Sequence, residues 1–202
     1  MSTEGALFVG SGGGGGRAQT DDGDPGAAHA ASDGARAHFV SKYGDTITRT
    51  YAFVSAFESG FATDWCRTRG LNKRTLTSAQ RIRSQLCRLW LHVVGQVDTG
   101  ARQPAAFSEE DRRAVRRALT TGFFTRAAVR QANGKYLTLD SREEVYIHPS
   151  SVLMHRKPAC VLFQELVNTS RLYIRELTVI EEAWLAELAP QHFDAAGGSG
   201  SF

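Results

Sequence analysis

Three arginines at a spacing of seven residues are the pattern in this sequence that most directly indicates binding chemistry. Arg74, Arg81 and Arg88 lie in a segment predicted to be helical, so this spacing places them on nearly the same face. Guanidinium groups contact phosphates, and phosphate neutralisation supplies most of the sequence-independent affinity of proteins for nucleic acids. The row therefore predicts contacts to a phosphate backbone. A solvated row, or salt bridges to domains outside this chain, are the alternatives.

The distribution of charge supports a polyanionic partner. The chain of 202 residues has a net charge of +3, but residues 36–130 carry 17 basic residues against 7 acidic ones. Residues 1–35 and 131–202 are both net acidic. A concentrated basic segment indicates a polyanion, although Arg-rich helices are also simply solvated. For a second cluster, spread around its helix, we expect a solvated face: Arg112, Arg113, Arg116 and Arg117.

Residues for catalysis or metal binding are present but not suitably arranged. The glycine run at 10–16 is not followed by the Gly-Lys-Ser/Thr of a phosphate-binding loop. The cysteines are scattered and odd in number, which indicates a reducing compartment, and neither they nor the histidines have zinc-ligand spacing. His148, Ser150 and Asp140 lack the nucleophile elbow of a hydrolase. We therefore predict no catalytic residue, metal site or cofactor site, and we expect a strand-ending turn at 148–151.

Helical periodicity dominates the first part of the chain. It predicts helices over 45–61, over roughly 73–94 and from Ser108 towards Arg130. Asp45 and Ser108 are expected to cap the first and third helices, whereas the second has several candidate caps, Asn72 among them. In the second helix, an apolar stripe lies beside the arginine row and is expected to pack inward: Ile82, Leu86 and Leu89.

Short β-rich runs separated by turn residues follow the third helix. They predict strands near 135–139, 144–148, 159–167 and 172–177, with a possible short strand at 178–180. A final short helix over 184–189 ends at Pro190 and is expected to anchor Trp184, Leu185 and Phe193 to the sheet. Residues 1–37 and 195–202 are rich in Gly, Ala and Ser and are predicted to be disordered. No apolar run reaches the roughly 18 residues of a membrane span, so no membrane partner is expected.

The stretch from 122 to 190 resembles the C-terminal oligonucleotide-binding (OB) fold region of DEAH-box RNA helicases. Its motifs include Gly122-Phe123-Phe124, Ile147-His148-Pro149-Ser150-Ser151 and Trp184-Leu185, in the family's order. Upstream, Trp65-Cys66 and Leu71-Asn72 resemble the end of the helical ratchet domain that precedes this fold. The resemblance covers about 38–194.

The resemblance implies an α+β fold, in which a helical ratchet end precedes a small five-stranded OB-like barrel with a C-terminal helix. The domains expected are a disordered segment at 1–37, the ratchet end at 38–98, the OB-fold domain at 99–194 and a disordered tail at 195–202. ATP and magnesium belong to the ATPase lobes of the parent helicase. This chain shows no DEAH motif and no arginine finger, so ATP hydrolysis is not expected of it alone.

The resemblance also implies an RNA-binding module of an ATP-dependent helicase that serves pre-mRNA splicing or ribosome biogenesis in the nucleus or nucleolus. Single-stranded RNA, an activating protein and the rest of the helicase core are the expected partners. A stand-alone interaction scaffold without RNA binding is the alternative. A helix cap is an equally open role for Asn72, and a core aromatic is the stronger alternative role for Tyr136. The predicted RNA contacts are Asn72, Arg74, Arg81, Arg88, Lys135, Tyr136, Arg156 and Lys157.

Overall fold

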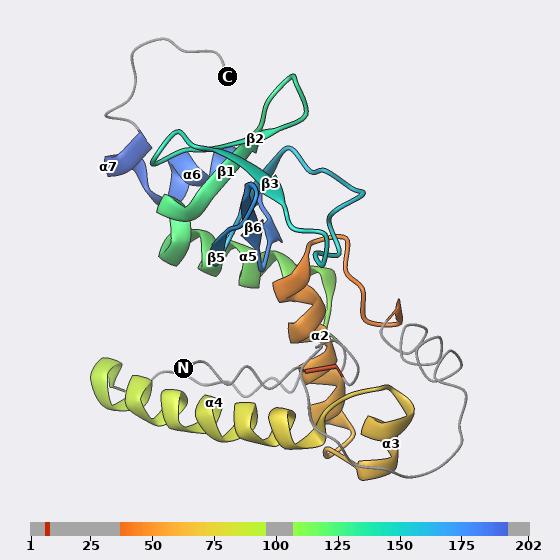
Figure 1. The fold of residues 1–202 in the computed structure, drawn as a ribbon. Coiled ribbons are helices and arrows are strands. Elements are labelled where there is room, and N and C mark those ends of the chain that lie inside the picture. Colours follow the sequence, from red (N-terminus) through yellow and green to blue (C-terminus); the bar gives the residue numbers. More distant parts are fainter. Residues whose placement is uncertain (1–6, 9–36, 96–106, 194–202) are drawn as a thin grey trace, which may run out of the picture. The chain divides into compact units, whose positions relative to one another are not determined.

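The computed structural model describes residues 7–8, 37–95 and 107–193, which fall into two compact units (Figure 1). The helical unit contains the residues up to Phe39 together with Tyr51–Phe107. The barrel unit contains Val40–Thr50 and Ser108–Phe202. The predicted disordered segments, 1–37 and 195–202, lie almost entirely outside the described residues. The predicted domain limits, 38–98 and 99–194, stay predictions.

In the described part of the helical unit there are three helices: α2 (Asp45–Glu58), which begins in the barrel unit, α3 (Thr63–Thr68) and α4 (Lys73–Val94). Phe39 and Leu76 are completely buried in its core, together with alanines of α2. Phe8 is also buried there and forms a β-bridge with Leu71, although it falls in the segment predicted to be disordered. Among the described residues, no helix is both long and apolar enough to cross a bilayer.

Helix α4 has the predicted limits but not the predicted packing. Leu76 in its first turns is buried, whereas Ile82, Leu86 and Leu89 are 56–61% exposed. The expectation that these three side chains pack inward is therefore wrong. The periodicity that predicts an apolar face does not supply a partner for that face.

Helix α5 (Glu109–Phe123) confirms the predicted start of the third helix but not its end. Ser108 Oγ accepts a hydrogen bond from the Asp111 backbone N–H (3.1 Å), and the Asp111 carboxylate accepts one from the Ser108 N–H (2.9 Å). This reciprocal capping box satisfies two backbone donors that a helix otherwise leaves free. After a single 3-10 turn, η1 (Phe124–Arg126), the chain enters strand β1 (Ala127–Arg130), which was predicted to be helical.

Six further strands complete the sheet in the described part of the chain, which gives seven in all (Figure 1). They are β2 (Tyr136–Thr138), β3 (Glu144–Ile147), β4 (Cys160–Leu162), β5 (Glu165–Asn168), β6 (Leu172–Arg175) and β7 (Thr178–Val179). The order is β5-β6-β3-β2-β1-β4-β7, and only β3 and β6 are parallel.

The helical segment, curled sheet and C-terminal helix confirm the predicted α+β, OB-like fold, but the predicted count of five strands is wrong. One extra strand is β1. The other arises because the predicted strand at 159–167 is divided at Phe163-Gln164. Before this break β4 pairs with β1, and after it β5 pairs with β6. The chain thus crosses from one end of the sheet order to the other within two residues, which curls the sheet into a partly open barrel.

Two apolar layers stabilise the barrel unit. Val145, Val161 and Ile174 are completely buried inside the sheet. On its other side, Trp184 and Leu185 of helix α6 (Ala183–Leu188) are each 2% exposed and pack on residues of β1 and β4. This confirms the predicted anchor for these two residues. The side chain of Phe193, in the short helix α7 (Pro190–Phe193), lies outside the described residues.

Gly44 and Asp45 join the Val40–Thr50 segment to the barrel. Asp45 was predicted to cap α2. Instead, its buried carboxylate accepts hydrogen bonds from Ser151 Oγ (2.7 Å), Val152 N (2.9 Å) and Leu177 N (3.0 Å). Gly44 has a φ of +108°, and a Cβ there would lie 2.3 Å from the Leu177 carbonyl oxygen, so only glycine fits.

Candidate nucleic-acid interface

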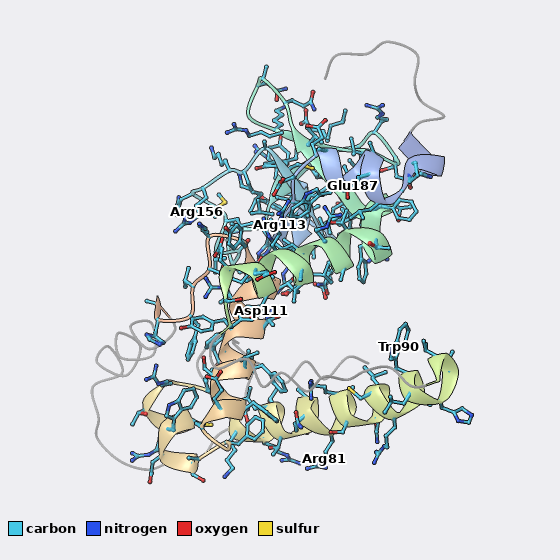
Figure 2. All side chains as sticks on the ribbon, turned by 180° about the vertical axis from the view of Figure 1, so that it is seen from behind. Arg81, Trp90, Asp111, Arg113, Arg156 and Glu187 are labelled. Carbon is cyan, nitrogen blue, oxygen red and sulfur yellow. The ribbon has the colours of Figure 1, made fainter. Side chains whose placement is uncertain are left out.

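The predicted arginine row lies on the exposed surface of α4. Arg74, Arg81 and Arg88 are all exposed, and none of them forms a salt bridge with another described residue. Figure 2 shows Arg81 extending from α4 into open space. The sequence of α4 contains five Lys and Arg residues and no Asp or Glu. The row is therefore a run of uncompensated positive charge, as a phosphate backbone requires.

Asn72 is the N-cap of the same helix. Its side-chain oxygen accepts a hydrogen bond from the Thr75 N–H at 3.2 Å. The Asn72 oxygen thereby satisfies one of the backbone N–H groups that have no partner within the first turn of α4. The geometry favours the cap over the RNA-facing amide among the two roles predicted for Asn72.

Tyr136 is a core residue of the barrel. Its side chain is 3% exposed, and its hydroxyl donates a hydrogen bond to the Pro158 carbonyl oxygen at 2.6 Å. Burial raises the pKa of the Tyr136 phenol to about 12. Because the Tyr136 ring presents no free face on which a base could stack, the structure favours the core role over the RNA contact.

Lys135 is paired with an acidic neighbour. Its Nζ lies 2.8 and 2.9 Å from the two carboxylate oxygens of Glu144. The hydrogen bond raises the pKa of Lys135 and lowers that of Glu144, so both groups are charged at neutral pH. A phosphate must compete with Glu144 for this ammonium group, which makes Lys135 a weaker candidate contact than its sequence position indicates.

Arg156 and Lys157 lie in the connection between β3 and β4. Both backbone N–H groups donate to the Leu153 carbonyl oxygen, at 2.9 and 3.2 Å, which holds the loop in a tight turn. Both side chains are exposed, and Figure 2 shows Arg156 extending away from the loop. Neither forms a salt bridge with another described residue. They remain available for phosphate contacts.

A pair of tyrosines on neighbouring strands escaped the sequence prediction. Val145 and Ile147 of β3 and Ile174 of β6 are buried inside the barrel. Side chains alternate along a strand, so Tyr146 and Tyr173 face outward. They are directly opposite in the parallel β3–β6 ladder, and their ring centroids are 6.2 Å apart. Both are only partly buried.

Basic groups surround this pair. The Arg171 guanidinium lies 5.0 Å from the centre of the Tyr146 ring, and Lys135 Nζ lies 6.0 Å from it. His148 packs edge-on against Tyr173, with 5.7 Å between ring centroids. We call these five residues the tyrosine patch: Lys135, Tyr146, His148, Arg171 and Tyr173. The alternation of Tyr146 with Val145 and Ile147 was visible in the sequence, but the parallel pairing that brings Tyr173 beside it was not.

The second arginine cluster, on α5, is largely committed to structure. Arg116 is only 6% exposed, so the expected solvated face is wrong for this residue. Its guanidinium lies 4.0 Å from the Tyr43 ring centre and 4.9 Å from that of Trp184, and it donates to the Val179 carbonyl at 3.2 Å. Burial lowers the Arg116 pKa. Arg117 forms a two-pronged ion pair with Glu187 of α6.

A small pocket of about 270 Å³ opens on the barrel unit. Thr138, Ser141, Arg126 and Leu166 are among its lining residues. The hydroxyls of Thr138 and Ser141 lie 2.9 Å apart, and Ser141 also donates to the Glu143 carboxylate at 2.8 Å. These polar groups already form hydrogen bonds with one another. The pocket therefore presents fewer polar groups for binding a ligand than the exposed tyrosine patch does.

Comparison with known proteins identifies the barrel. Residues 115–192 match the family described as oligonucleotide/oligosaccharide-binding (OB)-fold, which is typical of the C-termini of DEAH-box helicases. The chain is 38% identical over 160 residues to the ATP-dependent RNA helicase DHX33 of Homo sapiens, covering 79% of this chain and 22% of that protein. The chain resembles a DEAH-box helicase C-terminus.

Two further relatives agree with this resemblance. The pre-mRNA-splicing factor ATP-dependent RNA helicase DEAH10 of Arabidopsis thaliana is 38% identical over 173 residues, covering 79% of this chain and 23% of that protein. DHX33 of Mus musculus is 35% identical over 158 residues, covering 78% and 22%. The chain therefore spans less than a quarter of the length of these curated relatives.

Proposed function

We propose that this chain binds single-stranded RNA as the C-terminal module of an ATP-dependent DEAH-box RNA helicase. The observation that carries the proposal is the outward-facing pair of Tyr146 and Tyr173 beside the exposed Arg171. Every base has a π-face, so stacking on aromatic side chains favours single strands without demanding a particular sequence. Nearby cations hold the phosphates that connect the stacked bases.

The fold supports this placement. OB-folds bind oligonucleotides through an exposed sheet surface and the loops next to it. The tyrosine patch lies on such a surface, and Arg156 and Lys157 lie in one of the loops of the same unit. The arginine row of α4, in the helical unit, supplies a second region for backbone contacts.

We further propose the cellular setting from the relatives. Two of them are named ATP-dependent RNA helicases and the third a pre-mRNA-splicing factor as well. A role in pre-mRNA splicing or ribosome biogenesis, in the nucleus or nucleolus, follows from this kinship. ATP and magnesium would be bound by the ATPase lobes of the parent helicase, and an activating protein is the expected further partner.

The test of RNA binding is a titration of the full chain into a fluorescein-labelled 12-nucleotide poly-U RNA, followed by fluorescence anisotropy. We expect weak binding at 50 mM salt that falls steeply by 200 mM, because counterions are released from the strand. Tyr146→Ala and Tyr173→Ala should each weaken it by about 5- to 100-fold, the equivalent of roughly 1–3 kcal/mol per stacked base. Asn168→Ala, an exposed change on β5, is the matched control.

The arginine row is tested separately through the salt dependence. Each phosphate contact on a single strand contributes about 0.7 to the slope of log affinity against log salt. Arg81→Gln with Arg88→Gln should therefore lower the slope by about 1.4 if both touch phosphates. Arg67→Gln with Arg142→Gln removes the same charge from other exposed positions and serves as the control.

A chain that binds no RNA at 50 mM salt, or binds it equally well at every salt concentration, would refute the proposal. The alternative of an interaction scaffold without RNA binding would then be favoured. Unchanged affinity in both tyrosine variants, with RNA binding otherwise intact, would move the site away from the tyrosine patch while leaving the module an RNA binder.

A further inference from the structure

The pocket on the barrel unit opens into the interior of the sheet. Leu166 of β5 is directly opposite Ile174 of β6 in the antiparallel ladder, so both side chains lie on the same face of the sheet. Ile174 is completely buried inside the barrel, whereas Leu166 lines the pocket and is 46% exposed. An inward-facing side chain that is exposed to this extent marks a place where the barrel is open. The mouths of β-barrels are common positions for small-ligand sites.

Apolar side chains line the inner part of this pocket. Phe163, at the break between β4 and β5, is 5% exposed and belongs to the barrel core, and it lines the pocket together with Leu166. The volume of about 270 Å³ lies just below the range of about 300–1,000 Å³ that is usual for drug-sized ligands. The pocket therefore suits a single small ring system that covers the exposed part of Leu166.

Two exposed charged side chains, Arg126 and Asp140, also line the pocket. Arg126 Nη1 donates a hydrogen bond to the Gln164 carbonyl oxygen, and the other guanidinium N–H groups remain available to a ligand. The Asp140 carboxylate forms no hydrogen bond or ion pair with another described residue, Arg126 included. The pocket thus presents a fork of donors and a pair of acceptor oxygens that do not neutralise each other.

This combination of groups matches one RNA base. Guanine has two adjacent acceptors, O6 and N7, and on another edge two adjacent donors, the N1–H and the N2 amine. Arginine pairs with O6 and N7 through two hydrogen bonds. The two oxygens of a carboxylate can accept both donors. No other RNA base has both a pair of adjacent acceptors and a pair of adjacent donors, so every other base leaves one of the two side chains incompletely bonded.

We propose that this pocket binds a single guanine base, which the RNA strand supplies. Asp140 accepts from the N1–H and the N2 amine, Arg126 donates to the acceptor edge, and the purine ring covers Phe163 and Leu166. The proposal rests on the proposed RNA-binding function and extends it from stacking without sequence preference to recognition of one base. A free amino acid also carries both charges, but the match of residues 115–192 to an oligonucleotide-binding family favours the base.

The test compares three mononucleotides that have the same ribose and phosphate: GMP, IMP and AMP. IMP lacks only the N2 amine of GMP, whereas AMP has neither the donor pair nor the acceptor pair. The full chain, isotope-labelled at leucine methyl groups, is titrated with each nucleotide, and the shift of the Leu166 methyl signals in NMR spectra gives the affinity at the pocket. GMP should bind about tenfold more tightly than AMP, with IMP between them, because a bidentate pair discriminates between bases by this order.

Matched variants assign the preference to Asp140. Asp140→Asn puts a donor where guanine needs an acceptor, so it should weaken GMP binding by about tenfold and AMP binding by less than about threefold. Asp64→Asn makes the same chemical change at an exposed position of the helical unit and should leave both affinities unchanged. Leu166→Ala removes apolar surface and should weaken all three nucleotides by about fivefold without changing their order. Circular dichroism checks that each variant folds.

Three results would overturn the inference: equal affinities of the three nucleotides, a preference for GMP that Asp140→Asn retains, or a site that binds L-leucine more tightly than GMP. Titration with the poly-U RNA separates this inference from the proposed function, because uracil lacks both pairs of groups and Asp140→Asn should not weaken it. Equal nucleotide affinities with salt-dependent poly-U binding refute only the guanine pocket. A preference for GMP without poly-U binding refutes the RNA strand as the source of the base and leaves the guanine site.

Discussion

Replacing Asp45 by asparagine tests how the N-terminal part of α2 is held to the barrel. The Asp45 carboxylate accepts three hydrogen bonds, two at Oδ2 from Ser151 and Leu177 and one at Oδ1 from Val152. Asparagine has the same shape but only one acceptor oxygen. If that oxygen takes the place of Oδ2, the amide NH₂ faces the Val152 N–H, and two donors meet. The opposite orientation leaves the Leu177 N–H without an acceptor.

The cost follows from this single mismatch. A buried backbone N–H without an acceptor costs about 1–3 kcal/mol. The remaining bonds also lose the strength that a charged acceptor adds, which is roughly another 1 kcal/mol. We therefore expect Asp45→Asn to lower the free energy of unfolding by about 2–4 kcal/mol. At a urea dependence of about 2 kcal/mol per M, the unfolding midpoint falls by roughly 1–2 M.

The assay is equilibrium unfolding in urea, followed by tryptophan fluorescence for the barrel through Trp184 and by far-ultraviolet circular dichroism. Asp64→Asn makes the same chemical change at a side chain that is 88% exposed and should stay within about 0.5 kcal/mol of wild type. An Asp45→Asn protein as stable as the Asp64→Asn control would refute the reasoning, because the buried donors would then have found other acceptors.

Three further predictions concern buried residues of the barrel unit. Gly44→Ala should cost about 3 kcal/mol or more in the same urea assay, because its methyl group meets the Leu177 carbonyl and its backbone is left-handed. Arg116→Lys should cost about 1–2 kcal/mol, since an ammonium group cannot reproduce a planar guanidinium packed on two rings; a stability equal to wild type would contradict this. Ellman's reagent should modify the exposed Cys87 rapidly in the folded chain but not Cys160, whose pKa burial raises to about 12, so that only about one thiol in ten thousand is ionised at pH 8. The pKa of this thiol is 9.0 in the unfolded chain, so a rise in pH from that value to about 12 should favour unfolding. Rapid reaction of more than one thiol per folded chain with Ellman's reagent at pH 8 would refute the Cys160 prediction.

The elements that local sequence specifies were predicted well. The helix start at Ser108 and the limits of α4 depend on residues within a few positions of one another. The resemblance to DEAH-box helicases likewise rests on short motifs in a fixed order, and the comparisons confirm it. Helical periodicity, capping and motif order are properties of the sequence itself, so no tertiary contact was needed to read them.

Strand pairing was the main part that sequence could not supply. Ala127–Arg130 is too short to show a period, and it forms a strand because β2 and β4 bind it on both sides. The run from Cys160 to Asn168 looks like one strand, and it is two because its partner changes from β1 to β6 at Phe163-Gln164. Hydrogen-bonding partners far along the chain decide both outcomes.

The binding surfaces, too, were predicted from the sequence only in part. The sequence by itself determined that Arg74, Arg81 and Arg88 share a helix face, because a spacing of seven residues fixes direction around a helix. Only the tertiary structure decided that Tyr136 is buried while Tyr146 and Tyr173 meet on the outside, and that Ile82, Leu86 and Leu89 of α4 are exposed. Periodicity tells which side chains point the same way, whereas burial depends on what the rest of the chain places against them.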